Sequence, residues 1–560
     1  MLLIPILAIG FILRIVGIGV GLPDYPDSRE PLIAQDILNL IHLKAVPEIY
    51  NWPGTAWFYL IAAMGKILEV CGFVLTVPHV IWLARFTNAL LSTGTLWLTY
   101  QIGVRFYSRF VGCIGAGFLA LAMLHATNES RFALVDIPAT FCVTLLLWFC
   151  AKDQATSFRR AIWLGVLAGI GFAVKYTTVF AGLSVIAFFF IHRTEGWGRT
   201  LLKLATVLGV GAISFTLICP YWLIDLFSPE WNQFFDALFY EVSHYRRGHF
   251  GLFATGEVTW ANRLTYLWIL LRWGMGWPLA LLAFIGILIG MIERRDGDNI
   301  LLAFVLSYLL FIALHKLKFA RHLLLVYPAL TVFAAASIGK GRKGRKGKDG
   351  RTEMEGWKVG RLEDCLFPSL HPSILPFSHL ISRFTFHVSR FTSSCLLVSF
   401  LGGVGAYSLI YTAAFAGVLT TPPTPIETAE WIAFNIPPDE AVAHEPEILF
   451  DWLLPKLDRE YDGEDARWVV VLMPNAEIFL NYMEKPDSYS AIDWYPMEIH
   501  PETTVPFYKR IFGDASRYEL AHVFQRHPRF LGISISDQGA PFPMRALAHP
   551  EIRVYRLREF

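Results

Sequence analysis

Eleven apolar segments, most of them long enough to cross a lipid bilayer, constrain the fold of this 560-residue chain more than any other feature of its sequence. A membrane-spanning helix needs about 20 predominantly apolar residues. Only 17% of the residues are charged, whereas a soluble domain usually carries about 25%. The sequence therefore predicts an all-α polytopic membrane domain. The predicted spanning helices cover approximately residues 2–21, 79–104, 110–125, 133–151, 160–175, 176–192, 201–223, 264–291, 299–315, 321–339 and 394–419.

A twelfth apolar segment, Pro53–Phe73, is interrupted by Lys66 and Glu69. Its larger apolar residues share one helical face, as an interfacial helix requires. They are Trp57, Leu60, Ile61, Met64 and Leu68. If this segment lies flat on the membrane, one set of loops becomes consistently basic. The sequence therefore predicts that it lies in the interface.

The basic loops orient the chain, because Lys and Arg concentrate on the cytoplasmic side of membrane proteins. They contain Arg105 and Arg109, then Lys152, Arg159 and Arg160, then Arg193, Arg199 and Lys203, then Arg294 and Arg295, and the run GKGRKGRKGKDGR at 339–351. The opposite loops are then extracytoplasmic. The first apolar segment reads as a retained helix, since it lacks a basic n-region and a small-residue cleavage site. We expect an integral plasma-membrane protein of prokaryotic type.

Four regions follow from these patterns. A transmembrane domain covers residues 1–339, a basic, low-complexity cytoplasmic linker 340–392, a last transmembrane helix 393–419, and an extracytoplasmic α/β domain 420–560. In the last region a capped helix is expected at Glu427–Asn435, and strands at Arg467–Met473, Phe530–Ser536 and Ile552–Leu557. This domain has neither a glycine-rich phosphate loop nor catalytic-triad spacing, so we assign it no chemistry.

Composition also narrows the function. The net charge is only +2, which gives no electrostatic basis for binding nucleic acid. The seven cysteines are scattered without zinc-site spacing, which favours small buried apolar residues over a disulfide or metal framework. His244 and His249 could bind a divalent metal, with Glu48 or Glu241, but a solvated loop explains them more simply. A divalent metal is therefore left open, and no other cofactor is predicted.

Carboxylates gather on the predicted outer side. Asp24, Asp27 and Glu30 lie in the first outer loop, and Asp136 lies at the start of a later helix. A transferase that moves a sugar needs a carboxylate to take the proton of the acceptor or to stabilise positive charge at the anomeric carbon. The alternative for Asp136 is a helix N-cap, supported by Pro138, and the alternative for Asp24 is a turn.

Cations gather on the same side, against the usual charge bias. They are Arg131, Lys175, Arg246, Arg247, Lys318 and Arg321. Arg pairs bidentately with phosphate and Lys acts as a point charge, so this set could hold a lipid-linked phosphate. A single such residue would be explained by snorkelling to headgroups, but several together favour a phosphate site.

Eight motifs occur in order along residues 1–340. They are YPDSREP, YNWPGTAWFYL, RFTNALLSTGTLWLTY, ESRFALVDIPATF, GVLAGIGFAVKYT, CPYWLIDL, HYRRGHFG and KFARHLLLVYPAL. In these motifs the chain resembles the C-type fold (GT-C) glycosyltransferases, and most of all the protein O-mannosyltransferase and aminoarabinose-transferase group, glycosyltransferase family 39 and its bacterial relatives. The resemblance implies a polyprenyl-phosphate sugar donor, used on the outer face without a nucleotide.

The resemblance also implies roles for residues. The first-loop carboxylate of the family maps best onto Asp27, although the family's adjacent Asp-Glu pair is here split by Ser28 and Arg29, so Asp24 and Glu30 remain competitors. The second acidic position maps onto Asp136. The donor phosphate would be held by Lys175, Lys318, Arg321 and Arg131. The loop carrying His244, Tyr245, Arg246 and His249 would contact substrate.

The sequence thus predicts an inverting membrane glycosyltransferase that moves a sugar from a polyprenyl phosphate to a lipid, glycan or protein acceptor. A transporter or flippase of lipid-linked saccharides is the first alternative. It would place polar residues at the membrane midplane and show repeated halves. A scaffold without catalytic activity is the second alternative. It predicts that Asp27, Asp136 and Lys318 can be replaced freely.

Overall fold

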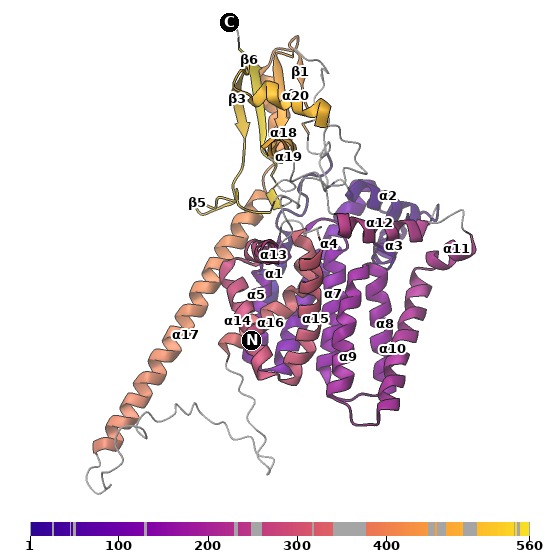
Figure 1. Cartoon of the computed structure of the whole chain (residues 1–560), viewed down its shortest axis with the longest axis vertical. Coiled ribbons are helices and arrows are strands. Elements are labelled where there is room, and N and C mark those ends of the chain that lie inside the picture. Colours follow the sequence, from indigo (N-terminus) through magenta and orange to yellow (C-terminus); the bar gives the residue numbers. More distant parts are fainter. Residues whose placement is uncertain are drawn as a thin grey trace.

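A helical bundle carries a small β-sheet domain at one end (Figure 1). The computed structural model describes residues 2–24, 27, 29–44, 46–48, 52–127, 131–228, 233–247, 260–315, 319–339, 377–445, 454–455, 466–484, 501–541, 544–545 and 549–558. We call the end of the bundle that carries the sheet the domain-bearing face. Every site described below lies at or beyond this face.

All eleven predicted spanning segments are helical. The long helices of the bundle are α1 (Leu3–Ile15), α4 (Val77–Phe106), α5 (Arg109–Ala120), α7 (Asp136–Lys152), α8 (Phe158–Val174), α9 (Gly182–Ile191), α10 (Trp197–Ile218), α13 (Trp260–Met275), α14 (Trp277–Glu293), α15 (Asp296–Leu314), α16 (Tyr327–Ile338) and α17 (Phe377–Val418). By length and composition, four stretches of the described residues could each cross a membrane alone: Trp197–Ile218, Asp296–Leu314, Ala320–Ile338 and Val398–Val418. The protein is an integral membrane protein, and the count of eleven spans stays a prediction.

The predicted single helix at 264–291 is instead two helices. The chain turns at Gly276, whose φ of +82° favours glycine, and Pro278 then lies in the first turn of α14. Hydropathy alone could not reveal this break, because both halves are apolar.

Four helices lie at the domain-bearing face (Figure 1): α2 (Glu30–Ile41), α3 (Thr55–Val70), α11 (Tyr221–Phe227) and α12 (Gln233–Arg247). Helix α3 corresponds to the predicted interfacial segment. It buries Trp57 and Ile61, whereas Leu60, expected on the same face, is 43% exposed. Three short elements complete this end: α6 (Met123–Ala126), η2 (Tyr176–Ala181) and η3 (Ala320–Val326).

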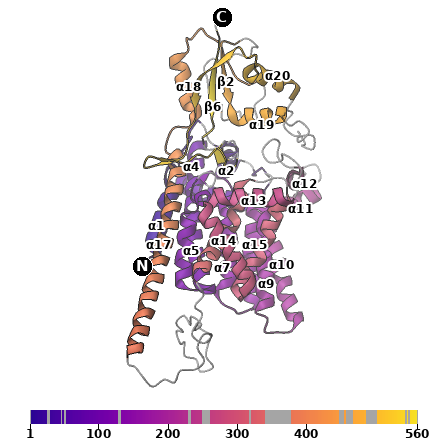
Figure 2. The same ribbon diagram turned by 60° about the vertical axis from the view of Figure 1, so that its left-hand side comes forward.

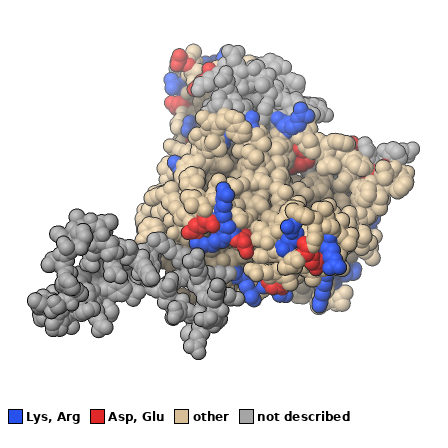
Figure 3. All heavy atoms as spheres, turned by 60° about the horizontal axis from the view of Figure 1, so that its bottom comes forward, with Lys and Arg blue, Asp and Glu red and all other residues tan. Residues whose placement is uncertain are grey.

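Charged side chains gather at the opposite end of the bundle, whereas the visible sides are largely uncharged (Figure 3). The exposed cations on the connections predicted to be cytoplasmic include Arg105, Lys152, Arg193 and Arg294. Residues 340–376 of the predicted linker lie outside the described residues, and 377–392 form the beginning of α17. Helix α17 is therefore longer than the span expected at 394–419.

The C-terminal domain is built on a four-stranded sheet in the order β1-β2-β6-β3, in which β1 and β2 are parallel and the other pairs antiparallel. Figure 2 shows this sheet beside its helices, above the bundle. The elements are α18 (Thr424–Asn435), β1 (Val442–Ala443), β2 (Trp468–Leu472), α19 (Met473–Glu484), α20 (Pro501–Phe512), β3 (Tyr518–Phe524), β4 (Arg529–Phe530), β5 (Ile533–Ser534) and β6 (Ile552–Leu557).

Two of the three strands expected in this domain are present as β2 and β6. The expected strand Phe530–Ser536 is instead a hairpin, because Leu531 and Gly532 adopt positive φ angles of 48° and 83° and reverse the chain between β4 and β5. The sequence did not predict strand β3. Its side chains are exposed from Glu519 to Val523, so it lacks the alternation of buried and exposed residues that marks a half-buried strand.

A fully buried ion pair joins α2 to α4. Arg85 donates from Nε to Glu30 Oε1 at 2.7 Å and from Nη2 to Oε2 at 2.5 Å, and both side chains are fully buried. The remaining Nη1 donates to the carbonyls of Ile18 and Val20 at 2.9 and 2.8 Å. This arrangement pairs the buried charges and ties the end of the first helical segment to α2.

We expect Arg85→Met to destabilise the protein by about 3–5 kcal/mol, because it leaves the Glu30 carboxylate buried without its partner. Thermal unfolding in detergent measures this loss. The control is Arg295→Gln, which removes an exposed ion pair with Glu293 and should change stability by about 1 kcal/mol or less. Equal melting temperatures for the two variants would contradict the structural role of Arg85.

Candidate functional site

An open cavity of ≈ 460 Å³ lies at the domain-bearing face. Its walls come from the loop before α2, the loop before α3, the start of α7, the end of α8, α12 and η3. The lining residues are Arg29, Trp52, Leu134, Val135, Asp136, Lys175, Glu241, His244, Phe319, Arg321 and His322. Segments from six parts of the chain thus bring acids, cations and histidines to one place.

An acid and two cations form the floor of the cavity. Lys175 Nζ lies 2.7 Å from Asp136 Oδ1, and Arg321 Nε lies 4.0 Å from Asp136 Oδ2. Asp136 is the first residue of α7, and Val135, not Asp136, is its N-cap. Lys175 follows the last turn of α8 in an extended conformation, so the end of one helix meets the beginning of another. Asp136 therefore orients two cations instead of capping its helix.

The first loop adds a second acid and a third cation. Asp27 is buried, and its Oδ1 accepts a hydrogen bond from the Arg29 backbone N–H at 3.2 Å. Burial and then the neighbouring Glu30 raise the pKa of the Asp27 carboxyl, while Arg321 and Arg29 oppose the rise. The Arg29 guanidinium lies over the Trp52 ring, 5.0 Å from its centroid. Asp24, in contrast, is exposed.

Glu30 is occupied by structural contacts. Besides Arg85, it accepts hydrogen bonds from the backbone N–H of Asp27 at 2.9 Å and of Ala133 at 2.6 Å. One carboxylate therefore fastens the loop that carries Asp27 to the segment that leads into Asp136. Of the three first-loop acids, this geometry leaves Asp27 as the one placed beside the cavity cations.

Helix α12 forms another wall. Glu241 and His244 face the cavity from this helix, and His244 stacks on Tyr240 with ring centroids 5.4 Å apart. Tyr245 is buried against His322 and Phe311, whereas Arg246 is exposed. The neighbouring predicted substrate residue, His249, lies outside the described residues.

Among the predicted phosphate ligands that the structure describes, Arg131 does not line this cavity. Arg131 is buried beside α1, where its Nη2 donates to the Leu13 carbonyl at 3.2 Å and to Thr127 at 3.3 Å. Lys318 lies outside the described residues, one position before the lining residue Phe319. Their phosphate-binding role remains a prediction.

Sequence reasoning gave no role at the donor site to Arg29, Trp52, Glu241 or His322. Two of these residues lie in motifs that could have pointed to the site, because Arg29 lies within the acidic first loop and His322 within the KFARH motif. Glu241 was considered only as a metal ligand. Among the described residues, no three His, Cys, Asp or Glu side chains are arranged to hold a metal ion.

Burial raises the pKa of Glu241 to about 7, although Lys175, Arg29 and Arg321 oppose the rise. The folded protein therefore holds a proton that the unfolded chain releases near its ordinary pKa of 4.5. The stabilisation is complete below that value and is lost as pH rises through about 7. A shift of this size corresponds to at most about 3 kcal/mol.

We expect Glu241→Gln to melt at a higher temperature than the parent at pH 8 and at a similar temperature at pH 4.5. Melting curves in detergent across this range measure the difference. Glu48→Gln, which changes an exposed carboxylate at the same face, serves as the control and should show no such pH dependence. A constant difference between Glu241→Gln and the parent at every pH would contradict the burial of a protonated carboxyl.

Comparisons with known proteins concern the family and the fold of the chain. Residues 56–224 match the family model described as dolichyl-phosphate-mannose-protein mannosyltransferase. The crystal structure of ArnT from Cupriavidus metallidurans bound to undecaprenyl phosphate aligns with 89% of this chain and 96% of its own, with a TM-score of 0.50 and 15% identity. No curated protein matches by sequence.

Two further solved structures show weaker likeness. Archaeal oligosaccharyltransferase AglB from Archaeoglobus fulgidus, in complex with an inhibitory peptide and a dolichol-phosphate, aligns with 96% of this chain and 74% of its own, with a TM-score of 0.47 and 12% identity. The S. cerevisiae Pmt1-Pmt2 complex bound to the sugar donor aligns with 42% of this chain and 34% of its own, with a TM-score of 0.33 and 17% identity. The resemblance to GT-C glycosyltransferases is confirmed, and the fold is similar to that of ArnT.

Proposed function

We propose that this membrane protein is an inverting glycosyltransferase that moves a sugar from a polyprenyl phosphate to an acceptor at the domain-bearing face. The observation that carries the proposal is the cavity in which Asp136 orients Lys175 and Arg321, with Asp27 beside them. A phosphate needs cations, and an acceptor hydroxyl or amine needs a base. The cations line the cavity, and Asp27 is close enough to Arg29 and Arg321 to interact with them electrostatically.

In this reaction the acceptor atom attacks the anomeric carbon as the bond from that carbon to the phosphate oxygen breaks. The leaving phosphate takes the electron pair of that bond, and Lys175, Arg321 and Arg29 stabilise its charge without protonating it. Asp27 accepts the proton that the acceptor loses, and its raised pKa makes it a better base than an ordinary carboxylate. A single displacement inverts the anomeric configuration.

Two observations support a lipid donor. The matched family model is named for a dolichyl-phosphate sugar, and the ArnT structure contains undecaprenyl phosphate. In this chain the cavity opens where the bundle meets the C-terminal domain, so a lipid tail could remain in the bilayer while the phosphate reaches the cations. The basic connections at the opposite end support an extracytoplasmic position for this face.

The test is a transfer assay with purified protein in detergent, labelled polyprenyl-phosphate sugars, and membrane-lipid, cell-wall and peptide fractions as acceptors. We expect donor-dependent release of polyprenyl phosphate together with a labelled product of inverted configuration. Parallel reactions with EDTA and with added Mg²⁺ or Mn²⁺ establish whether a divalent metal takes part. No turnover with any donor, alongside movement of sugar lipids across vesicles, would instead identify a flippase.

A further inference from the structure

A small hairpin projects from the C-terminal domain. It consists of β4 and β5, in which Arg529 pairs with Ser534 and Phe530 with Ile533, and its turn is Leu531–Gly532. Leu531 is 85% exposed and Ile533 is 51% exposed. The tip of the hairpin therefore presents two large apolar side chains away from the protein.

Leucine is unusual at this position. Leu531 has a φ of +48°, and the two-residue turns of hairpins with such angles favour Asn, Asp or Gly. A bulky side chain in this region of φ is uncommon, and packing within the protein cannot explain it, because the side chain is almost fully exposed. A partner outside the chain would explain why an exposed leucine, and not Asn, Asp or Gly, occupies this turn position.

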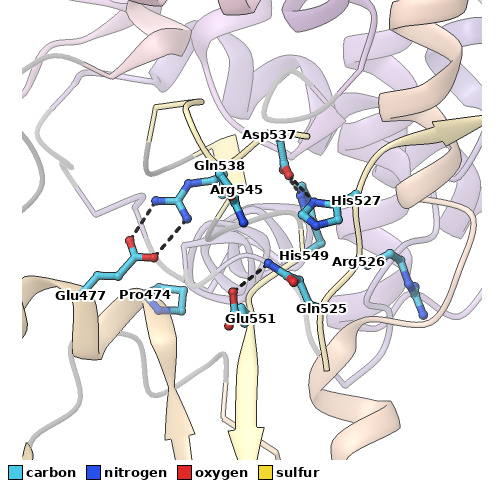
Figure 4. A pocket seen from close by; sticks show the side chains of 10 residues that line it. All are labelled: Pro474, Glu477, Gln525, Arg526, His527, Asp537, Gln538, Arg545, His549 and Glu551. Carbon is cyan, nitrogen blue, oxygen red and sulfur yellow. Dashed lines mark hydrogen bonds and ion pairs between the residues drawn. The ribbon is translucent and has the colours of Figure 1, made fainter. Parts of the chain in front are cut away.

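The base of the hairpin is held firmly. His527 precedes β4 and Asp537 follows β5, and Asp537 lies 2.8 Å from His527 Nδ1 and 2.5 Å from His549 Nε2 (Figure 4). The Ile535 N–H also donates to the Pro528 carbonyl at 2.9 Å. Farther along, Ala540 and Met544 pack into the core of the helical bundle. The tip is thus carried at a defined position relative to the bundle.

That position is the end of a membrane-spanning helix. Strand β4 packs against α17 so closely that a Cβ at Gly417 would lie 3.1 Å from the Arg529 carbonyl. Gly417 is the second-last residue of the apolar stretch Val398–Val418. Because a strand advances about 3.3 Å per residue, Leu531 lies within about 7 Å of that level. The hairpin points sideways, away from the bundle (Figures 1 and 2).

We propose that this hairpin is a membrane anchor, and that Leu531 and Ile533 insert into the lipid interface on the domain-bearing face. The exposed Arg529 lies beside them, where it can pair with headgroup phosphates, as Arg does at other membrane interfaces. The anchor holds the C-terminal domain against the bilayer at a point beyond α17. This inference is independent of the proposed transferase activity.

The test places an environment-sensitive fluorescent amino acid at position 531 of the full chain, in vesicles of phosphatidylcholine and phosphatidylglycerol. The matched control is the same probe at Glu519, an exposed residue at the other end of β3. We expect lipid-borne nitroxide to quench the probe at 531 at least threefold more than at 519, and iodide in the water to do the reverse. Equal quenching by iodide at the two positions would overturn the proposed anchor. Protection of position 531 from both quenchers would also overturn it, and would indicate that a second copy of the chain covers the hairpin.

A second variant separates lipid contact from folding. Leu531→Asn introduces a residue that tolerates the positive φ at this position, so the hairpin should still form. The substitution removes the more exposed of the two apolar side chains at the tip. A probe at Ile533 should then lose at least half of its quenching by lipid nitroxide. Unchanged quenching at position 533 in this variant would refute the role of Leu531.

Discussion

Asp27→Asn is expected to lower kcat of sugar transfer by about 10²–10⁴-fold, the usual contribution of a general base. The amide keeps the size of the side chain and can still accept the hydrogen bond from the Arg29 N–H, but it cannot take a proton from the acceptor. The KM for the lipid donor should change little, because Lys175 and Arg321 remain. Steady-state kinetics with the labelled donor measure both constants.

Asp24→Asn is the matched control for this substitution. Asp24 lies three positions earlier in the same loop, and its side chain is exposed. This variant should retain nearly full activity. If Asp24→Asn abolished transfer while Asp27→Asn did not, the base would have to be assigned to Asp24. Full activity in both variants would exclude this loop from the chemistry.

Lys175→Gln is expected to lower kcat by about 10²–10³-fold, the effect of losing one preorganised group that stabilises charge in the transition state. Lys175 lies 2.7 Å from Asp136 and is buried, so its ammonium is held in place before substrate arrives. The substitution also leaves Asp136 with Arg321 as its remaining ion-pair partner among the described residues. The donor KM should therefore rise as well.

Lys203→Gln is the control for Lys175→Gln. Lys203 is a buried lysine that pairs with Glu195 at 2.8 Å, at the opposite end of the bundle. Removing it tests the loss of a lysine–carboxylate pair without touching the cavity. Transfer should remain near the parent rate, and melting temperatures of both variants should show that they fold. Equal losses of activity in the two variants would count against a phosphate role for Lys175.

The grouping of Asp136, Lys175 and Arg321 could be predicted from the sequence because it depends mainly on topology. Each residue lies at or near the end of a helix, and alternating helices return to the same face. The choice among the first-loop acids could not be made in this way. It depends on Arg85, whose guanidinium occupies Glu30 and leaves Asp27 beside the cavity.

Two of the errors in the fold have a common cause. The helix expected at 264–291 and the strand expected at Phe530–Ser536 are both interrupted by residues with positive φ, Gly276 in the first and Leu531–Gly532 in the second. Apolar residues on both sides concealed these breaks. The place of Glu241 in the cavity could not be predicted, because its burial depends on how α12 packs over the cavity. No local sequence pattern encodes that packing.

The contacts of Glu30 have a consequence for how such an enzyme could acquire new substrates. Glu30 fastens the loop of Asp27 and the approach to Asp136 to one another, so these two acids form a unit of fixed geometry. Glu241 and His244 belong to a different helix, α12, which is not bound to that unit by Glu30. Substitutions confined to α12 would therefore leave in place the hydrogen bonds of Glu30 that fix these two acids. Evolution of this chain would be free to vary one wall of the cavity and conserve the other.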